Sequence, residues 1–85
     1  MYNNDIAIKY SQEIYEEMVR ASGKFPMFNS EHEGYAIILE EMDELWEEVK
    51  KNQNDPYRKE NCRKECIQVG AMALRFLHDM ELRDE

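Results

Sequence analysis

Residues that interrupt helices or cross-link chains are scarce in this sequence. Three glycines and two prolines among 85 residues leave long stretches that can remain helical. The two cysteines, Cys62 and Cys66, are four residues apart inside a helical pattern. This spacing is not a CxxC redox motif, and no histidine or further cysteine completes a zinc site. We interpret both cysteines as reduced, partly buried thiols.

Positive charge is scarce as well. Lysine and arginine total 11 against 19 aspartates and glutamates, which gives a formal net charge of −8. This balance predicts that the protein does not bind a nucleic acid polymer, because such binding needs basic side chains that neutralise phosphates. It argues equally against binding to an anionic membrane surface. A single nucleotide remains compatible, since a bound divalent cation inverts the local charge.

No apolar run in the sequence is long enough to cross a membrane. The longest, residues 66–77, is interrupted by Gln68 and Arg75 and is far shorter than the roughly 20 residues that a span needs. The N-terminus shows no signal peptide pattern. We therefore expect a cytoplasmic protein with one domain over residues 1–85, whose core is so small that self-association would stabilise it.

Helical periodicity accounts for almost everything that remains, so the predicted fold class is all-α. Two clusters of breakers, at residues 22–30 and 52–56, divide the chain into three segments. We expect helices at about residues 4–21, 31–51 and 56–80.

The first two helices each carry an apolar stripe. In the first helix Gly23 is placed to end the helix, after a stripe formed by Ile6, Tyr10, Ile14 and Met18. The second begins with a capping box, in which Ser30 is the N-cap and Glu33 the reciprocal partner. We expect Trp46 to lie in the core as part of its apolar face, which comprises Tyr35, Ile38, Leu39, Met42, Leu45, Trp46 and Val49.

The third helix is predicted to begin with Asp55 as its N-cap and Pro56 in its first position. Between residues 66 and 77 nearly every side chain is apolar or small, and a helix that is apolar all round must be covered on more than one side. Gly70, Ala71 and Ala73 would permit another helix to approach closely. Three helices from one chain can hardly provide this cover, so we predict that a homodimer or homotetramer completes the helix bundle.

Most acidic residues of the second helix are expected on its solvated side, but Glu41, Glu44 and Glu48 are exceptions, and Glu48 lies on nearly the same line as Glu41. At 100° per residue, Glu41 lies at the margin of the apolar face, and Glu44, three residues later, points toward the same region. On the third helix, Glu65 falls inside the apolar stripe itself. An unpaired buried carboxylate is so unfavourable that something must compensate Glu65.

Two explanations for Glu65 remain open. In the first, Glu65 forms a structural ion pair with a basic residue. The candidates are Arg58, Arg63 and Arg75. In the second, Glu65 meets Glu41 and Glu44 across a helix–helix contact, and the three carboxylates bind a hard divalent cation. Oxygen ligands alone suit Mg²⁺ or Mn²⁺ rather than zinc.

These residues resemble the motifs of the MazG-like nucleotide pyrophosphohydrolases, an all-helical family with E-E-x-x-E on one helix and E-x-x-D on the next. The corresponding segments here are Glu40-Glu41-Met42-Asp43-Glu44 and Glu65-Cys66-Ile67-Gln68. Residues 32–41 and 68–73 look like a short MazG-like subgroup found in bacteria and their phages. The resemblance covers about residues 30–79.

The resemblance implies magnesium-dependent hydrolysis of a nucleoside triphosphate to a monophosphate and pyrophosphate. It implies that Glu41, Glu44 and Glu65 bind Mg²⁺, for which Mn²⁺ can substitute. Glu40 and Glu41 would contribute to catalysis, Glu40 by orienting a water or a second ion. Gln68 stands where the motif has aspartate. Its amide oxygen can still coordinate a cation, but the site loses one negative charge.

Three hypotheses about function follow from the sequence. The first is this enzyme. The second is a bacterial or phage-encoded MazG-like module that turns over weakly or not at all and sequesters a nucleotide or binds a protein partner. Gln68 and the absence of a clear fourth helix motivate it. The third is a structural helical oligomer whose acids are solvated or paired.

Basic residues such as Arg20 could meet phosphates, although their pattern favours solvent exposure.

Overall fold

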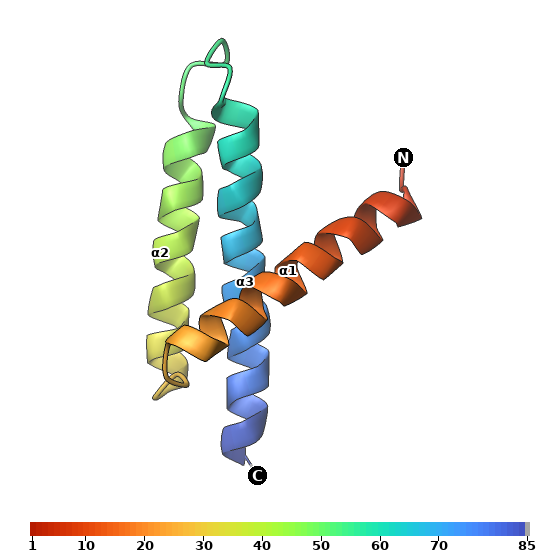
Figure 1. Cartoon of the computed structure of the whole chain (residues 1–85). Coiled ribbons are helices and arrows are strands. Elements are labelled where there is room, and N and C mark those ends of the chain that lie inside the picture. The colour runs from red at the N-terminus through yellow and green to blue at the C-terminus, as the bar shows by residue number, and fades with distance from the viewer. Residues whose placement is uncertain (85) are drawn as a thin grey trace.

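The computed structural model describes residues 1–84, which form three helices and no strand (Figure 1). The helices are α1 (Asn4–Lys24), α2 (Glu31–Val49) and α3 (Arg58–Asp84). The all-α prediction is confirmed. The predicted bounds differ from the observed ones by two to four residues at several helix ends. Both α1 and α3 extend further toward the C-terminus than expected, α2 is shorter, and α3 begins later.

The helix starts follow the predicted capping residues in part. Ser30 Oγ accepts the backbone N–H of Glu33 at 3.1 Å, as a capping box requires. The carboxylate of Glu33, however, accepts the backbone N–H of Asn29 at 3.2 Å, one residue before the cap. Asp55 accepts the N–H of Tyr57 at 2.9 Å and thereby stabilises a turn before α3, so the prediction that the helix starts directly at Pro56 was wrong.

The end of α1 differs from the expectation for Gly23. No described residue has a positive φ angle, and α1 continues through Gly23 to Lys24. Phe25 then adopts an extended conformation, with its N–H donating to Ala21 C=O at 2.9 Å. The residue before a proline is disfavoured in the helical region, so Pro26 accounts for the helix end and Gly23 does not.

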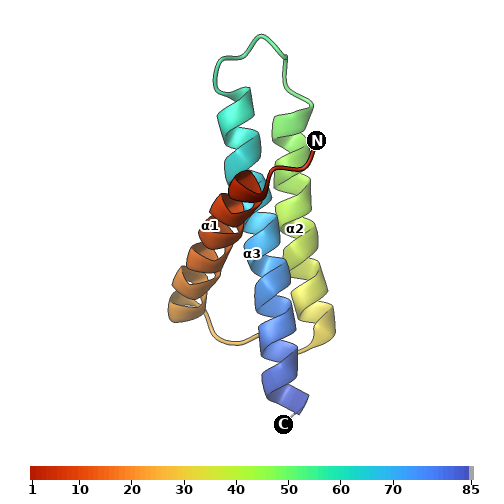
Figure 2. The ribbon, with the colours of Figure 1, turned by 90° about the vertical axis from the view of Figure 1, so that its right-hand side faces the viewer.

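The three helices form a hairpin with one helix laid across it. Antiparallel α2 and α3 lie side by side, and α1 crosses α3 obliquely (Figures 1 and 2). Only the C-terminal half of α1 packs into the core, and its N-terminal half projects away from the hairpin (Figure 1). Consequently, α3 is the central helix, with α1 and α2 covering two of its sides.

The core lies where the three helices and the α1–α2 loop meet. Its buried side chains are Met18, Ala21, Phe28, Ala71 and Met72. Two glycines allow close approach here. A Cβ on Gly34 would lie 2.5 Å from Phe76 Cδ2, and one on Gly70 would lie 2.8 Å from Ile14 Cδ1. Of the three small residues predicted to allow close helix packing, Gly70 and the buried Ala71 do so within the chain, whereas Ala73 is exposed.

The predicted apolar face of α2 divides into a half-buried part and an exposed part. Toward α3, Ile38 and Leu45 are half-buried. The exposed residues, with their exposed fractions, are Tyr35 (65%), Leu39 (45%), Met42 (46%), Trp46 (58%) and Val49 (37%). We call these five residues the α2 apolar stripe. The expectation that Trp46 lies in the core was therefore wrong for the single chain. The side of α2 that faces α3 is the margin of the predicted apolar face, which includes Glu41, and not the centre of that face.

The segment of α3 from residue 66 to residue 77 is covered better within one chain than predicted. Ala71 and Met72 are buried, and most of its other residues are half-buried beneath α1 and α2. The largest unpartnered apolar stripe on the hairpin is therefore on α2. In the described part of the chain, no helix combines the length and apolarity required to span a membrane.

Candidate metal centre

The structure brings Glu41, Glu44 and Glu65 together. Glu41 and Glu44 are one turn apart on α2, and Glu65 faces them from the adjacent turn of α3. One carboxylate oxygen from each residue lies within 4.8 Å of the other two. We call these three residues the acid cluster. Two helices of the hairpin thus place three oxygen donors around one small volume, as hard divalent cations require.

Repulsion and burial disfavour ionisation of the acid cluster. Glu41 and Glu65 are half-buried, whereas Glu44 is exposed. Burial, followed by the neighbouring charges of Glu44, Glu65 and Glu40, raises the pKa of Glu41 to about 7. Burial and Glu44 likewise raise the pKa of the Glu65 carboxyl. Without a cation, the cluster therefore retains protons that free glutamates would have lost, and a bound cation would relieve this repulsion.

None of the three arginines proposed as partners of Glu65 forms an ion pair with it in the described residues. Arg58 donates to Val49 C=O through Nε at 3.1 Å and through a second nitrogen at 2.7 Å. Arg63 lies 3.6 Å from Glu60, and Arg75 lies 3.8 Å from Asp79. Glu65 therefore forms no ion pair with any of these three arginines. The raised pKa of its carboxyl agrees with this, because no nearby cation stabilises its charge.

A hollow beside the acid cluster contains the remaining predicted residues, Glu40 and Gln68. It has a volume of about 340 Å³, and its lining includes Glu40, Glu41 and Gln68 together with Arg20 and Arg75. Pockets of a few hundred Å³ are typical of small-molecule sites. The hollow thus combines one residue of the acid cluster with two cationic side chains, and all three helices line it.

The first helix supplies residues that the sequence analysis did not single out as site residues. Glu17 accepts two hydrogen bonds from Arg20, at 2.8 Å and 2.5 Å. These bonds lower the pKa of the Glu17 carboxyl, and the neighbouring Gln68 amide lowers it further. The sequence signal that could have identified Glu17 was its position next to Met18, which belongs to the apolar stripe of α1.

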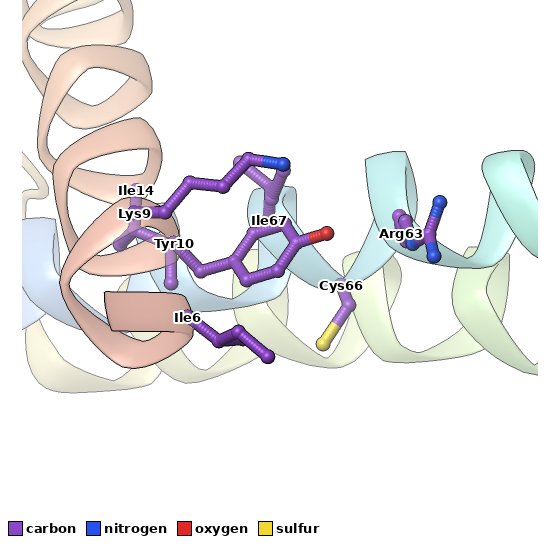
Figure 3. Close-up of a pocket in the computed structure, with 7 residues that line it drawn as sticks. All are labelled: Ile6, Lys9, Tyr10, Ile14, Arg63, Cys66 and Ile67. Carbon is purple, nitrogen blue, oxygen red and sulfur yellow. The ribbon is translucent and has the colours of Figure 1, made fainter. Parts of the chain in front are cut away.

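A second hollow, of about 490 Å³, lies where the projecting half of α1 diverges from α3 (Figure 3). Its lining is mostly apolar and consists of Ile6, Lys9, Tyr10, Ile14, Arg63, Cys66 and Ile67. Figure 3 shows Tyr10 extending from α1 toward α3. Because no carboxylate lines this hollow, it is not a cation site, and the acid cluster lies outside it.

No family model, curated protein or solved structure matches this chain. What the site can do therefore follows from its chemistry. Three carboxylate oxygens suit Mg²⁺ or Mn²⁺, and a carboxyl with a pKa of about 7 can accept or release a proton near neutral pH. Arg20, which lines the hollow and pairs with Glu17, carries a guanidinium group of the kind that binds phosphate oxygens. Arg75, in contrast, is held by Asp79 and by Pro26 C=O.

Proposed function

We propose that the protein is a MazG-like, magnesium-dependent nucleoside triphosphate pyrophosphohydrolase that converts a (d)NTP to a (d)NMP and pyrophosphate. The observation that carries this proposal is the convergence of Glu41, Glu44 and Glu65 from two helices within 4.8 Å, while the nearby arginines have other partners. Three acids arranged in this way lack a counter-charge, and Mg²⁺ or Mn²⁺ chelated by a triphosphate would provide it.

In this proposal the hollow of about 340 Å³ receives the triphosphate. The cation, when bound, neutralises phosphate oxygens and polarises the phosphorus that is attacked. Glu40 orients a water molecule, whose oxygen attacks the α-phosphorus of the α–β anhydride. The bridging P–O bond breaks, pyrophosphate leaves, and Glu41 accepts the proton from the water. Arg20, half-exposed at the hollow, contacts the phosphate oxygens.

Gln68 has a defined part in this scheme. Gln68 lines the hollow beside Glu17 and Glu41, and we assign its amide oxygen, rather than its NH₂ group, to the cation. Gln68 would then be a neutral fourth ligand beside the three carboxylates. The site has less negative charge than one with aspartate at this position, and its affinity for Mg²⁺ is correspondingly lower.

The same residue is the observation that favours a second candidate function. With Gln68 in place of an acid, the protein would bind a nucleotide without hydrolysing it efficiently, and it would sequester the nucleotide or regulate a protein partner. This weak or inactive module would retain the Mg²⁺ dependence of binding, because Glu41, Glu44 and Glu65 are unchanged.

Pyrophosphate release from a panel of ribo- and deoxyribonucleoside triphosphates, with Mg²⁺ or Mn²⁺, tests the enzyme directly. We expect release by the wild-type protein and none by Glu65→Gln. Glu60→Gln is the matched control, because Glu60 is an exposed glutamate on the same helix. Calorimetric nucleotide binding without any product would support the second candidate function. Absence of both binding and release would refute both.

We further propose that the protein acts in the cytoplasm as a homodimer or homotetramer. The small core and the α2 apolar stripe support self-association, because apolar surface of this extent is rarely left exposed on a working monomer.

A further inference from the structure

The side of α2 that faces away from α1 is apolar and unpartnered. The hollow beneath α1 is lined by Ile37 and Glu41 of α2, which identify the side of α2 that faces α1. At 100° per residue, the α2 apolar stripe lies on the opposite side of the helix. On α3, Leu77 is 66% exposed, but it lies about 20° from Gly70, against which Ile14 of α1 packs. The apolar face that α1 leaves free is therefore on α2.

The α2 apolar stripe has the spacing of a helix–helix interface. Its members are separated by 4, 3, 4 and 3 residues, which is the a/d pattern by which two helices pack in a coiled-coil seam. They fall within an arc of about 80° of the helix. Between Tyr35 and Val49 no charged residue occupies this arc, because the acids of α2 lie on its other sides. The stripe is therefore shaped to pack against another helix.

We propose that the α2 apolar stripe is the contact surface for a second copy of this chain, in which the two α2 helices pack antiparallel about a two-fold axis near Met42. The stripe is nearly symmetric about this residue in its spacing. An antiparallel pairing places Tyr35 against the partner's Val49 and Leu39 against the partner's Trp46, and each contact occurs twice. Such self-complementarity is what a two-fold interface requires.

The size of the surface agrees with this occupant. The five side chains expose on the order of 500 Å² per copy, given the large areas of aromatic side chains. A stable interface buries about 800 Å² per partner, and its polar rim supplies part of that area. Trp46 and Tyr35 belong to the residue types that contribute most to binding at such interfaces.

The proposed dimer is one form of the homo-oligomer that accompanies the proposed function. The evidence for it, however, is the apolar surface of α2 and not the nucleotide site. Glu40 and Glu44 lie on a different side of α2 from the stripe, and pairing through the stripe leaves the hollow beneath α1 open. Dimerisation is consequently expected without Mg²⁺ and without nucleotide. A variant that is monomeric should still bind Mg²⁺, so the two proposals can fail separately.

Sedimentation equilibrium over about a hundredfold range of concentration tests the interface. The wild-type protein should have twice the 10.3 kDa mass of the chain and dissociate on dilution. Trp46→Lys and Leu39→Lys, which alter exposed residues, should be monomeric with unchanged helical circular dichroism. Tyr15→Lys is the matched control, because Tyr15 is 54% exposed on α1 outside the stripe, and this variant should remain dimeric.

The single tryptophan gives a second, independent measurement on the unmodified protein. Trp46 emission should be blue-shifted and protected from acrylamide in the dimer, and it should become accessible on dilution. A mass of 10.3 kDa at every concentration would overturn the proposal. So would a dimer in which Trp46 remains accessible, since the contact would then use another face. A wild-type protein that associates only with a different protein would overturn it as well.

Discussion

Two groups of charged residues lie beside α3, and they differ in how their charges are compensated. In the N-terminal third of the helix, the acid cluster has three carboxylates and no cationic partner in the described residues. Three turns further on, Arg75 and Asp79 are 4% and 3% exposed, yet nearly all their polar groups have partners. We call this second group the loop clamp.

The loop clamp fastens the α1–α2 loop to α3. Asp79 Oδ2 accepts the backbone N–H of Phe28 at 3.0 Å, and its other oxygen lies 2.9 Å from His78 Nδ1. Arg75 donates to Pro26 C=O and lies over the Phe28 ring at 4.3 Å. Opposite charges and backbone groups satisfy each other here, as in a structural ion pair.

The comparison teaches that buried charge alone does not identify a functional site. The loop clamp is the more buried of the two groups, but its partners already explain why it is there. The acid cluster is less buried, and its like charges have no cationic partner among the described residues. Uncompensated charge, rather than burial, is therefore the feature on which the proposed cation site rests.

The largest effect is expected from breaking the loop clamp. Asp79→Asn should lower the free energy of unfolding by about 3–5 kcal/mol, because it leaves the Arg75 charge buried and unpaired. Urea unfolding monitored by circular dichroism measures this change. Asp84→Asn, at an exposed position of the same helix, should change stability by less than about 0.5 kcal/mol. Equal losses in the two variants would contradict the assigned role of Asp79.

Removing a charge from the acid cluster should raise the stability of the metal-free protein, whereas breaking the loop clamp lowers it. Glu65→Gln should raise the unfolding free energy of the metal-free protein by about 1 kcal/mol, because it relieves repulsion with Glu44. The same change should lower Mg²⁺ affinity by about 10- to 100-fold. Differential scanning fluorimetry with and without Mg²⁺ measures both effects. If Mg²⁺ still raises the melting temperature of Glu65→Gln as in wild type, the acid cluster is not the cation site and the third hypothesis, a structural oligomer, gains support.

Adding a charge should sharpen the comparison further. Gln68→Asp should raise Mg²⁺ affinity by about tenfold, because it supplies a fourth carboxylate to the site. It should also lower the stability of the metal-free protein through additional repulsion. Magnesium titration by calorimetry measures the affinity. Gln12→Asp, at an exposed position of α1, is the control. An unchanged affinity in Gln68→Asp would show that this residue does not face the cation.

The smallest expected effect is the pH dependence of the metal-free protein. Because the pKa of Glu41 is raised from 4.5 to about 7, the folded protein binds more protons than the unfolded chain between these values. Stability should therefore fall by about 1 kcal/mol as pH rises from about 4.5 to 7, after allowance for solvent screening. Mg²⁺ should remove this loss, since cation binding requires ionised carboxylates. Thermal unfolding from pH 5 to 8 checks the sign, and Glu41→Gln should reduce the slope.

The sequence anticipated the members of the acid cluster better than their surroundings. Glu65 was identifiable because an acid within an apolar stripe conflicts with the local pattern, and Glu41 because it lies at a margin. The sequence did not reveal the loop clamp, since Arg75 and Asp79 are an ordinary i, i+4 pair until the loop folds onto them. The contribution of Glu17 was hidden for the same reason, because it depends on the angle at which α1 crosses α3.

Local interactions along the chain determined the three helices, most of their caps and the acids that conflict with an apolar environment. Such features depend on neighbours within a few residues, so the sequence contains them directly. Only the tertiary structure decided which side of α2 faces α3, which arginines have other partners and which apolar residues remain uncovered. These outcomes depend on the rotation of each helix about its axis. A rotation of about 100° would exchange Glu41 for a residue of the α2 apolar stripe, and packing between distant segments selects that rotation.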